Sequence, residues 1–529
     1  MAAARRKKKK QGLASPVVFA ICLIAVSITG YFVWAVARQL DLKWPFATGA
    51  SGTGRGRGIY LDSGMQRAPI FDRSGTLLAT NTKILSAYAR PSLVPPGDEW
   101  VAKVSDILGV NQKKLSREIS SARNFVWLKT GISEAESERL KAADIPGVAV
   151  VEGFRRSYPY NNFASQVLGF VDQEGVGLEG VESFYDRRLG SECKDVERKD
   201  CSLHLTIEMG VQTMAEDELQ RELARMRGEE GCMVIMGLET GEILAMAVSP
   251  RWDIERFWRD DQAGFSNYAI KAVVDPSVFL LFTSWVAHQG QVYGQDGAVG
   301  PNNTKPSGFD FARVSDKFAV FGPWTGDEVK AVDFNENMLT SMWGLGFGQL
   351  TGIDLPNEDM GRLSSSRFYS WDDVLQQGMA ASPVQMLRAF SALINSGKLV
   401  QPHVAFEYPK KGQMSYWDFG LPAELGHGQE AEALSLEFRQ RLTSSRGLPF
   451  FTVRRRDDDG GTPGKAGAQI MSLGFWPEDS PILSYILVMD KVKEDPAGYV
   501  DVAGGVKKVL QAAARLPMDA PDYGGLSKK

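Results

Sequence analysis

Near the start of the chain, apolar positions form one unbroken run from Pro16 to Ala37, with no charged residue inside it. As a helix rising about 1.5 Å per residue, this run would extend about 33 Å and cross the hydrocarbon core of a bilayer. The residues from Arg5 to Lys10 are all basic, and such clusters keep the preceding end in the cytoplasm. The pattern predicts a cytoplasmic basic tail (1–15), a transmembrane helix (16–37) and an extracytoplasmic remainder.

A cleaved signal peptide is the alternative for this run, because Ala35-Val36-Ala37 resembles a small-residue cleavage site. The run exceeds the roughly 7–15 apolar residues usual for a signal core. We therefore expect an uncleaved anchor and a single-pass protein of the cytoplasmic membrane.

The next pattern is a linker, residues 38–66, that contains the glycine-rich sequence SGTGRGRG. It leads into a first α+β module, residues 67–204. Residues 68–80 predict two short strands around a turn at Arg73-Ser74-Gly75. Further helical patterns (99–109 and 133–143) alternate with strand-like ones (125–131 and 147–159).

A second module, residues 205–516, is introduced at 202–227 by a short strand that enters a long amphipathic helix. Residues 231–250 predict a hairpin that turns at Glu239–Glu242. The later elements are a helix at 382–397 ended by Gly397, strands at 468–477 and 481–490, and a helix at 505–516. Strands at both ends with helices between them predict an antiparallel sheet covered by helices, followed by a loose polar tail (517–529).

Composition narrows the functional classes. The chain has 529 residues, 43% of them hydrophobic and 23% charged, as in globular proteins. Its formal net charge is −4, and since Arg5–Lys10 contribute +6, the remainder carries −10. An acidic body argues against nucleic acid as a partner, because phosphate binding needs a basic face.

Four cysteines are present, and two of them suggest a disulfide. Cys193 and Cys201 lie in a polar stretch that would be outside the membrane, where an oxidising compartment permits the bond; two free thiols are the alternative. Cys22 and Cys232 lie in apolar surroundings and are interpreted as buried thiols. We expect no metal, because neither Cys-x-x-Cys nor a paired His spacing exists.

Several longer motifs resemble one family in a single order along residues 67–510. They are RAPIFDRSGTLLA (67–79), SYPYNNFASQVLGFVDQEGVGLEGVESFYDRRLGS (157–191), LTIEMGVQ (205–212), ETGEILAMAVSP (239–250), LGFGQLTGIDLPNEDMG (345–361) and QGMAASPVQMLRAFSALINSGKLVQPHV (377–404). Together they resemble class B penicillin-binding proteins of the cell-division transpeptidase type. The resemblance implies that the first module is a pedestal, or dimerisation-like, domain. It implies that the second is a transpeptidase domain with the serine β-lactamase-like fold.

The resemblance also implies a catalytic arrangement, and here the sequence departs from the family. There, a Ser-x-x-Lys motif supplies the nucleophile and its base, and Ser-x-Asn and Lys-Thr-Gly motifs complete the site. Ser277 stands at the nucleophile position, but Leu280 occupies the position of the lysine, and the Gly before the Ser is Pro276. Leu cannot accept a proton, and loss of a general base typically costs ~10²–10⁴-fold in rate.

The other two motifs are eroded as well. No Ser-x-Asn occurs at 318–332, where Thr325 and Asp327 are weak substitutes that an ordinary turn explains equally well. The third motif is Gly464-Lys465-Ala466-Gly467-Ala468, so Lys465 and Gly467 are retained for substrate binding. The Ala residues lack hydroxyls whose bonds to a substrate carboxylate are each worth about 1.5–3 kcal/mol.

Three other residues are candidate substitutes for the missing base. Lys271 lies six residues before Ser277, and His288 and His403 offer a Ser–His pair. Productive proton transfer requires about 3 Å geometry, and a lone His among apolar residues is more often structural.

Three functions are compatible with these residues. The first is a non-catalytic homologue that acts by interaction in a cell-wall or division assembly. The second is an active D,D-transpeptidase that cross-links peptidoglycan stem peptides through an acyl-enzyme on Ser277. The third, a β-lactam sensor, is disfavoured because only fifteen residues precede the predicted span. The resemblance implies no cofactor, a polytopic glycosyltransferase or other cell-wall protein as partner, and stem peptide or β-lactam as ligand if the site functions.

Overall fold

The structure is a computed structural model, and it describes part of the chain. The described residues are 66–122, 124–172, 175–191, 202–254, 266–274, 318–321, 342–363, 379–406, 415–416, 429–443, 450–456, 468–493 and 503–517. The predicted transmembrane helix (16–37) lies outside these residues. Within them, no helix is both long and apolar enough to cross a bilayer.

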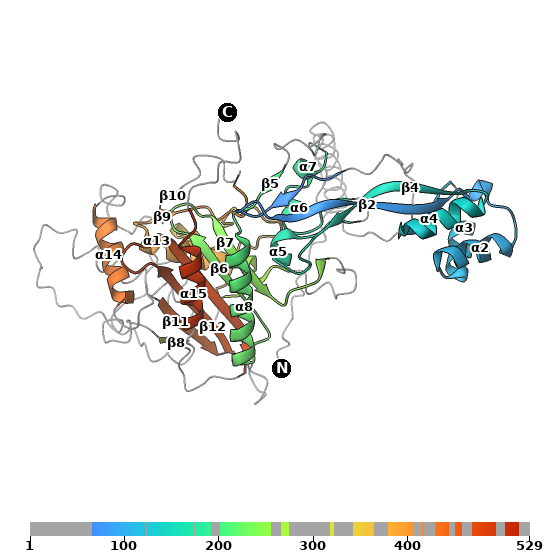
Figure 1. Ribbon diagram of the computed structural model, residues 1–529. Helices are drawn as coiled ribbons and strands as arrows, with labels where there is room; N and C mark the ends of the chain where they lie inside the picture. The colour runs from blue at the N-terminus through green and yellow to red at the C-terminus, as the bar shows by residue number, and fades with distance from the viewer. Residues whose placement is uncertain are drawn as a thin grey trace, which may run out of the picture. The chain divides into compact units, whose positions relative to one another are not determined.

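The pedestal is built on a five-stranded sheet in which the strands follow the order β3-β2-β1-β5, with β4 on β2 (Figure 1). Its strands are β1 (Ile70–Phe71), β2 (Leu77–Ala89), β3 (Val126–Ile132), β4 (Val148–Ser157) and β5 (Leu203–His204). The predicted turn at 73–75 is confirmed, because the Gly75 amide donates to the Asp72 carbonyl at 3.2 Å. The pairing of β1 with β5 is parallel, whereas the other pairs are antiparallel.

One end of the pedestal, which we call the head (residues 85–150), has a hydrophobic core of its own. Its buried side chains, among them Leu108, Leu128 and Leu140, pack with one another. The head helices are α2 (Asp98–Leu108), α3 (Gln112–Ser121) and α4 (Glu134–Ala143), after the short 3₁₀ turn η1 (Pro91–Leu93). Helix α4 begins with a complete capping box, in which Ser133 and Glu136 satisfy each other's backbone amides.

The other part of the pedestal, which we call the base (residues 66–81 and 156–191), contains short helices and buried charged side chains. The helices are α5 (Ser165–Leu168), α6 (Gly180–Phe184) and α7 (Asp186–Leu189). The fully buried Glu182 carboxylate accepts from Arg67 Nε at 2.9 Å and from Arg156 Nε at 2.6 Å. Two Arg residues and one Glu therefore pair in the interior, where an unpaired charge would be costly.

The transpeptidase domain contains a six-stranded antiparallel sheet, as the sequence predicts. Its strand order is β7-β6-β13-β12-β11-β8. The strands are β6 (Glu230–Gly237), β7 (Ile243–Ser249), β8 (Phe318–Phe321), β11 (Phe450–Arg456), β12 (Ala468–Trp476) and β13 (Leu483–Val492).

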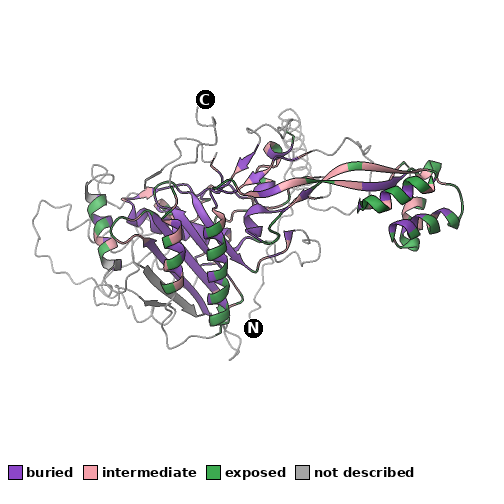
Figure 2. Cartoon of the chain, viewed as in Figure 1, coloured by how far each residue is buried: buried purple, intermediate pink, exposed green. Residues whose placement is uncertain are grey.

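Helices cover both faces of this sheet. Helices α8 (Met209–Met226) and α15 (Ala503–Ala513) lie side by side on one face (Figure 1) and pack on residues such as Met233 and Leu487. Alternate residues such as Val234 and Ile486 point to the other face, which packs on α13 (Pro383–Ile394) and α14 (Gln429–Thr443). Burial on both faces explains the nearly continuous hydrophobic strands, and β6, β7, β12 and β13 are buried over most of their length (Figure 2).

The remaining described elements are η5 (Tyr268–Ile270), β9 (Lys398–Leu399) and β10 (Ser415–Tyr416). Helix α13 ends at Ile394, slightly earlier than Gly397 predicts, although Gly397 does adopt a left-handed φ of 79°. Cys232 is a fully buried free thiol, as expected.

The base and the transpeptidase domain share one hydrophobic cluster. This cluster contains Ile70 and Val181 of the base together with Phe390 and Ile486 of the transpeptidase domain. By side-chain packing, the base therefore belongs with the transpeptidase core, whereas the head has a separate core.

Candidate functional site

The residues that carry the expected catalytic motifs lie outside the described residues. This holds for Ser277, Leu280, Thr325, Asp327, Lys465 and Gly467, and for the candidate disulfide Cys193–Cys201. The roles assigned to them stay predictions. The structure does describe the segments that flank the first and third motifs, and these segments meet.

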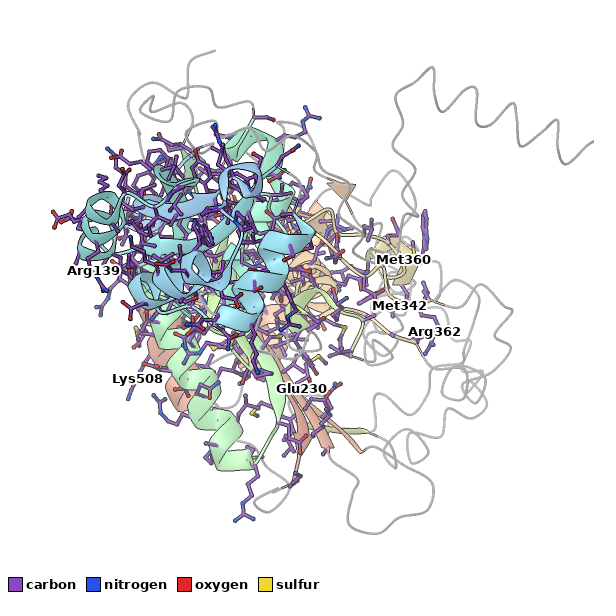
Figure 3. All side chains as sticks on the ribbon, turned by 90° about the vertical axis from the view of Figure 1, so that its right-hand side faces the viewer. Arg139, Glu230, Met342, Met360, Arg362 and Lys508 are labelled. Atoms are coloured by element: carbon purple, nitrogen blue, oxygen red, sulfur yellow. The ribbon has the colours of Figure 1, made fainter. Side chains whose placement is uncertain are left out.

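The segment that leads to Ser277 is held in a short ladder. Val274, three residues before Ser277, exchanges two backbone hydrogen bonds with Ala381, at 3.0 and 2.8 Å. The adjacent Ala380 pairs in the same way with Arg362, at 2.7 and 3.0 Å. Arg362, and Met360 two residues earlier in the chain, are labelled in Figure 3. The ladder fixes the approach to the nucleophile position against the start of α13.

The strand that follows the third motif is tied to the same segment. Gln469, the second residue of β12, is buried, and its Nε2 donates to the Val273 carbonyl at 2.9 Å. The same amide lies 3.4 Å from the Tyr268 hydroxyl. One side chain therefore joins the flank of Lys465-Ala466-Gly467 to the flank of Ser277, which lie far apart in the sequence.

Tyr268 links the segment before Ser277 to β13 by donating a hydrogen bond. Its hydroxyl donates to Asp490 Oδ2, near the end of β13, at 2.9 Å. Burial, followed by the charge of Asp490, raises the pKa of Tyr268 far above its ordinary value. The phenol therefore stays protonated and cannot serve as a general base at neutral pH.

Gln385 joins the start of α13 to the segment that follows the LGFG sequence. It closes a capping box with Ser382 at the start of α13. Its Nε2 also donates to the carbonyls of Gln349 and Met360, at 2.5 and 2.8 Å. One amide thus connects the helix N-terminus with both ends of the segment that follows the LGFG sequence.

Glu358 fixes that segment internally. Its Oε1 accepts from the Thr351 amide at 2.7 Å, and its Oε2 from the Gly352 amide at 3.1 Å. Burial raises the pKa of Glu358, and the hydrogen bonds from Thr351 and Gly352 oppose this rise. The carboxylate therefore has a structural role in the loop.

Two of the three candidate replacement bases, Lys271 and His403, are among the described residues. Burial raises the pKa of Glu179 in the pedestal base, while a hydrogen bond from Asn357 and the charge of Lys271 lower it. The Lys271 ammonium therefore acts on a pedestal carboxyl. His288 is not among the described residues.

His403 is a buried residue with a local hydrogen bond. Its Nδ1 lies 3.1 Å from the Gln401 carbonyl and acts as the donor, since a carbonyl only accepts. Burial lowers the pKa of His403 to about 4, and the charge of Arg73 adds to this effect. The imidazole is neutral at physiological pH and sits at the junction with the pedestal.

Sequence reasoning missed Gln469, Tyr268 and Gln385. Two of them carried a usable signal. Gln469 follows the third motif directly, and Ser382-x-x-Gln385 fits the capping-box pattern. Tyr268 has no local pattern, because its partner Asp490 is distant in the sequence. Across the described part of the chain, no three His, Cys, Asp or Glu side chains gather as a metal site would require.

An antiparallel sheet covered by helices on both faces and joined to an α+β pedestal defines the two-module architecture of penicillin-binding proteins. Family models support both modules. The Penicillin-binding Protein dimerisation domain matches residues 63–197, and the Penicillin binding protein transpeptidase domain matches residues 334–418. The second match begins after Ser277 and ends before Lys465.

Curated relatives give the particular family. Stage V sporulation protein D of Bacillus subtilis is 26% identical over 65% of this chain and 59% of its own length. The peptidoglycan D,D-transpeptidase FtsI of Escherichia coli is 24% identical over 63% of each chain. The chain thus spans less than two thirds of either relative. With its two domains and these relatives, the chain belongs to the class B penicillin-binding protein family.

Solved structures agree on the fold. The penicillin-binding protein PBP2 of Helicobacter pylori, solved in complex with MreC, matches with a TM-score of 0.61 at 16% identity. That match covers 85% of this chain and 97% of the other. A peptidoglycan synthetase of Bifidobacterium adolescentis matches with a TM-score of 0.54 at 18% identity, over 87% of this chain and 97% of the other. Likenesses at this identity show the fold alone.

Proposed function

We propose that this chain is a penicillin-binding-protein homologue of cell-wall synthesis and division that acts by interaction and has impaired acyl-transfer chemistry. The observation that carries the proposal is Leu280, an aliphatic side chain where the family has the lysine that activates the serine. A serine hydroxyl attacks an amide efficiently only when a positioned group accepts its proton.

The flanks of the candidate site differ from its motif residues, and this difference supports the proposal. The flanks of the site are joined by hydrogen bonds, from Gln469 to Val273, between Val274 and Ala381, and from Gln385 to Met360. The motif residues themselves have lost a base and the hydroxyls of the third motif. A chain under no constraint would lose packing and chemistry alike, so retained packing favours a role that needs the fold.

The proposed location is the cytoplasmic membrane, with residues 16–37 as a single span and the folded modules outside. The uncharged run and the basic residues before it support this topology. The proposed partners are proteins of a cell-wall or division assembly, including a polytopic glycosyltransferase. PBP2 of H. pylori, which has the same fold, was solved in complex with MreC.

The alternative is an active peptidoglycan D,D-transpeptidase. FtsI of E. coli, which resembles 63% of this chain, is named as a peptidoglycan D,D-transpeptidase. Ser277 and Lys465 are both retained. Activity would require that a group other than residue 280 accepts the serine proton.

A stem-peptide assay separates the two functions. The full chain, purified in detergent, is incubated with a synthetic pentapeptide ending in D-Ala-D-Ala, and released D-alanine is measured. We expect release no faster than with the matched Ser277→Ala chain. Release that disappears in Ser277→Ala would establish the active transpeptidase instead.

The interaction role has its own test. Ser277→Ala should support growth and division as well as the wild-type chain when it replaces that chain in its native cell. Loss of division with a stably expressed Ser277→Ala chain would contradict a role by interaction.

A further inference from the structure

Several buried polar contacts outside the candidate site involve Arg73. This residue lies in the turn after β1, and its guanidinium is almost fully buried, at 3% exposure. Its Nη1 donates to Glu242 Oε2 at 2.8 Å, and its Nη2 donates to the Pro517 carbonyl at 2.6 Å. It also lies over the ring of Phe406, 4.9 Å from the centroid. Four segments that are remote in the sequence therefore meet at one side chain.

The neighbouring groups join the pedestal to the start of helix α8. The Arg73 amide donates to the Ile207 carbonyl at 2.8 Å. Asp72 Oδ2 accepts from the Met209 amide, the first residue of α8, at 3.1 Å. Two consecutive pedestal residues thus hold the entry to the transpeptidase domain.

A buried ion pair lies at this junction. Glu242 is buried and forms the ion pair with Arg73. His403 lies beside them and is neutral, because burial and Arg73 lower its pKa to about 4. The Pro517 carbonyl adds a neutral acceptor to a cation, and such charge-assisted bonds are stronger than neutral ones.

The start of α8 and the segment after α15 both contact the same pedestal turn, at Asp72 and Arg73. Helix α8 begins beside Asp72, and helix α15 packs against α8 through Val506 and Leu510. The segment that follows α15 then returns to Arg73, the residue next to Asp72. The two helices on the outer face of the sheet are therefore fastened to the pedestal at both ends of the path.

We propose that the segment following α15 is a strap that locks the pedestal base onto the transpeptidase domain, with the Pro517 carbonyl as its fastening point on Arg73. The strap stabilises the junction from outside the candidate site. Cleavage of this segment, or its binding by another protein, would loosen the junction while leaving the contacts that flank Ser277 and Lys465 in place.

Two matched truncations of the full chain test the strap. One chain stops after Pro517 and keeps an oxygen acceptor at that residue; the other stops after Leu516. Hydrogen exchange is measured at the Arg73 and Phe406 amides, whose acceptors are Ile207 and His204. A lost bond to a buried cation should make these amides exchange at least about tenfold faster in the chain that ends at Leu516.

The internal control is helix α15, whose amides should exchange at the same rate in both truncated chains. Equal exchange at Arg73 and Phe406 in the two chains, or acceleration confined to α15, would overturn the proposal. Arg73→Lys provides a second variant, because a Lys ammonium does not reproduce the planar fork of Arg. In that background the removal of Pro517 should cause a smaller acceleration than in the wild-type background, and an undiminished effect would also overturn the proposal.

Discussion

The head and the base of the pedestal are parts of one domain, yet they are stabilised differently. The head has a separate hydrophobic core, and its ion pair Arg139–Asp106 is exposed to solvent. The base shares its core with the transpeptidase domain and contains the buried Arg67–Glu182–Arg156 group. The base is therefore a fixed part of the scaffold, while the head is an independently packed unit that is free to serve a separate role. This difference leads to predictions that are strongest for the base.

The largest effect is expected from Gly169→Ala in the base. Gly169 has a φ of +72°, and an added Cβ would lie 1.7 Å from the Glu179 carbonyl oxygen. Such a clash with backbone, together with the strained φ, should cost at least about 5 kcal/mol of unfolding free energy. In a chemical denaturation experiment on Gly169→Ala, the base should therefore be largely unfolded even without denaturant.

Gly153→Ala is the matched control in the strand that leads to the head. Gly153 lies in β4, and nothing lies within 4 Å of an added Cβ. The unfolding free energy of Gly153→Ala should differ from that of the wild-type chain by less than about 1 kcal/mol. A similar loss in both variants would show that the base has no special sensitivity.

Glu182→Gln should have the next largest effect. The substitution keeps the shape of the side chain but removes the charge that pairs with Arg67 and Arg156, all three being buried. Breaking a buried pair in this way costs about 3–5 kcal/mol. Asp106→Asn, in the exposed pair of the head, is the control and should change the denaturation midpoint very little.

These contrasts bear on what the sequence could predict. Hydrophobic periodicity predicted α2, α4, α8 and α15 and the antiparallel sheet, because those elements bury a face with a simple period. It did not predict that the base shares a core with the transpeptidase domain, since that packing joins residues as distant as Val181 and Phe390. Strand β8 was also missed, as its four residues are too short to give a pattern.

The residues of the candidate site also fall into two groups, those that local sequence identifies and those that depend on distant partners. Ser277 and Lys465 were named from motif resemblance, which depends on local sequence. Gln469 and Tyr268 act through partners about 200 residues away, Val273 and Asp490. Local sequence contains no information on such partners unless the fold is known.

Leu108→Ala should destabilise the head alone. Leu108 is fully buried at the end of α2, and removing its side chain should cost about 3 kcal/mol. Because the head has a separate core, slow-exchanging amides of β13 should keep their protection while those of β3 lose it. Equal loss of protection in β13 would show that head and transpeptidase domain unfold as one unit.

The smallest effect concerns acid stability of the head. A hydrogen bond from Lys129, followed by one from the Ser133 amide, lowers the pKa of Glu136 to about 2. Since this pKa lies below its value of 4.5 in an unfolded chain, the stabilisation is present above pH 4.5 and is lost as the pH falls towards 2. Solvent screening limits the loss to less than about 1 kcal/mol. In Glu136→Gln, urea midpoints of the head should vary less over this pH range, and an unchanged profile would contradict the assignment.

The central claim is that this chain retains the penicillin-binding fold without an activated serine, and covalent capture by penicillin tests it most directly. Intact-mass spectrometry of the full chain after incubation with benzylpenicillin should show an unmodified mass. A penicilloyl adduct that is absent from Ser277→Ala would contradict the claim, because it would prove that the serine loses its proton despite Leu280.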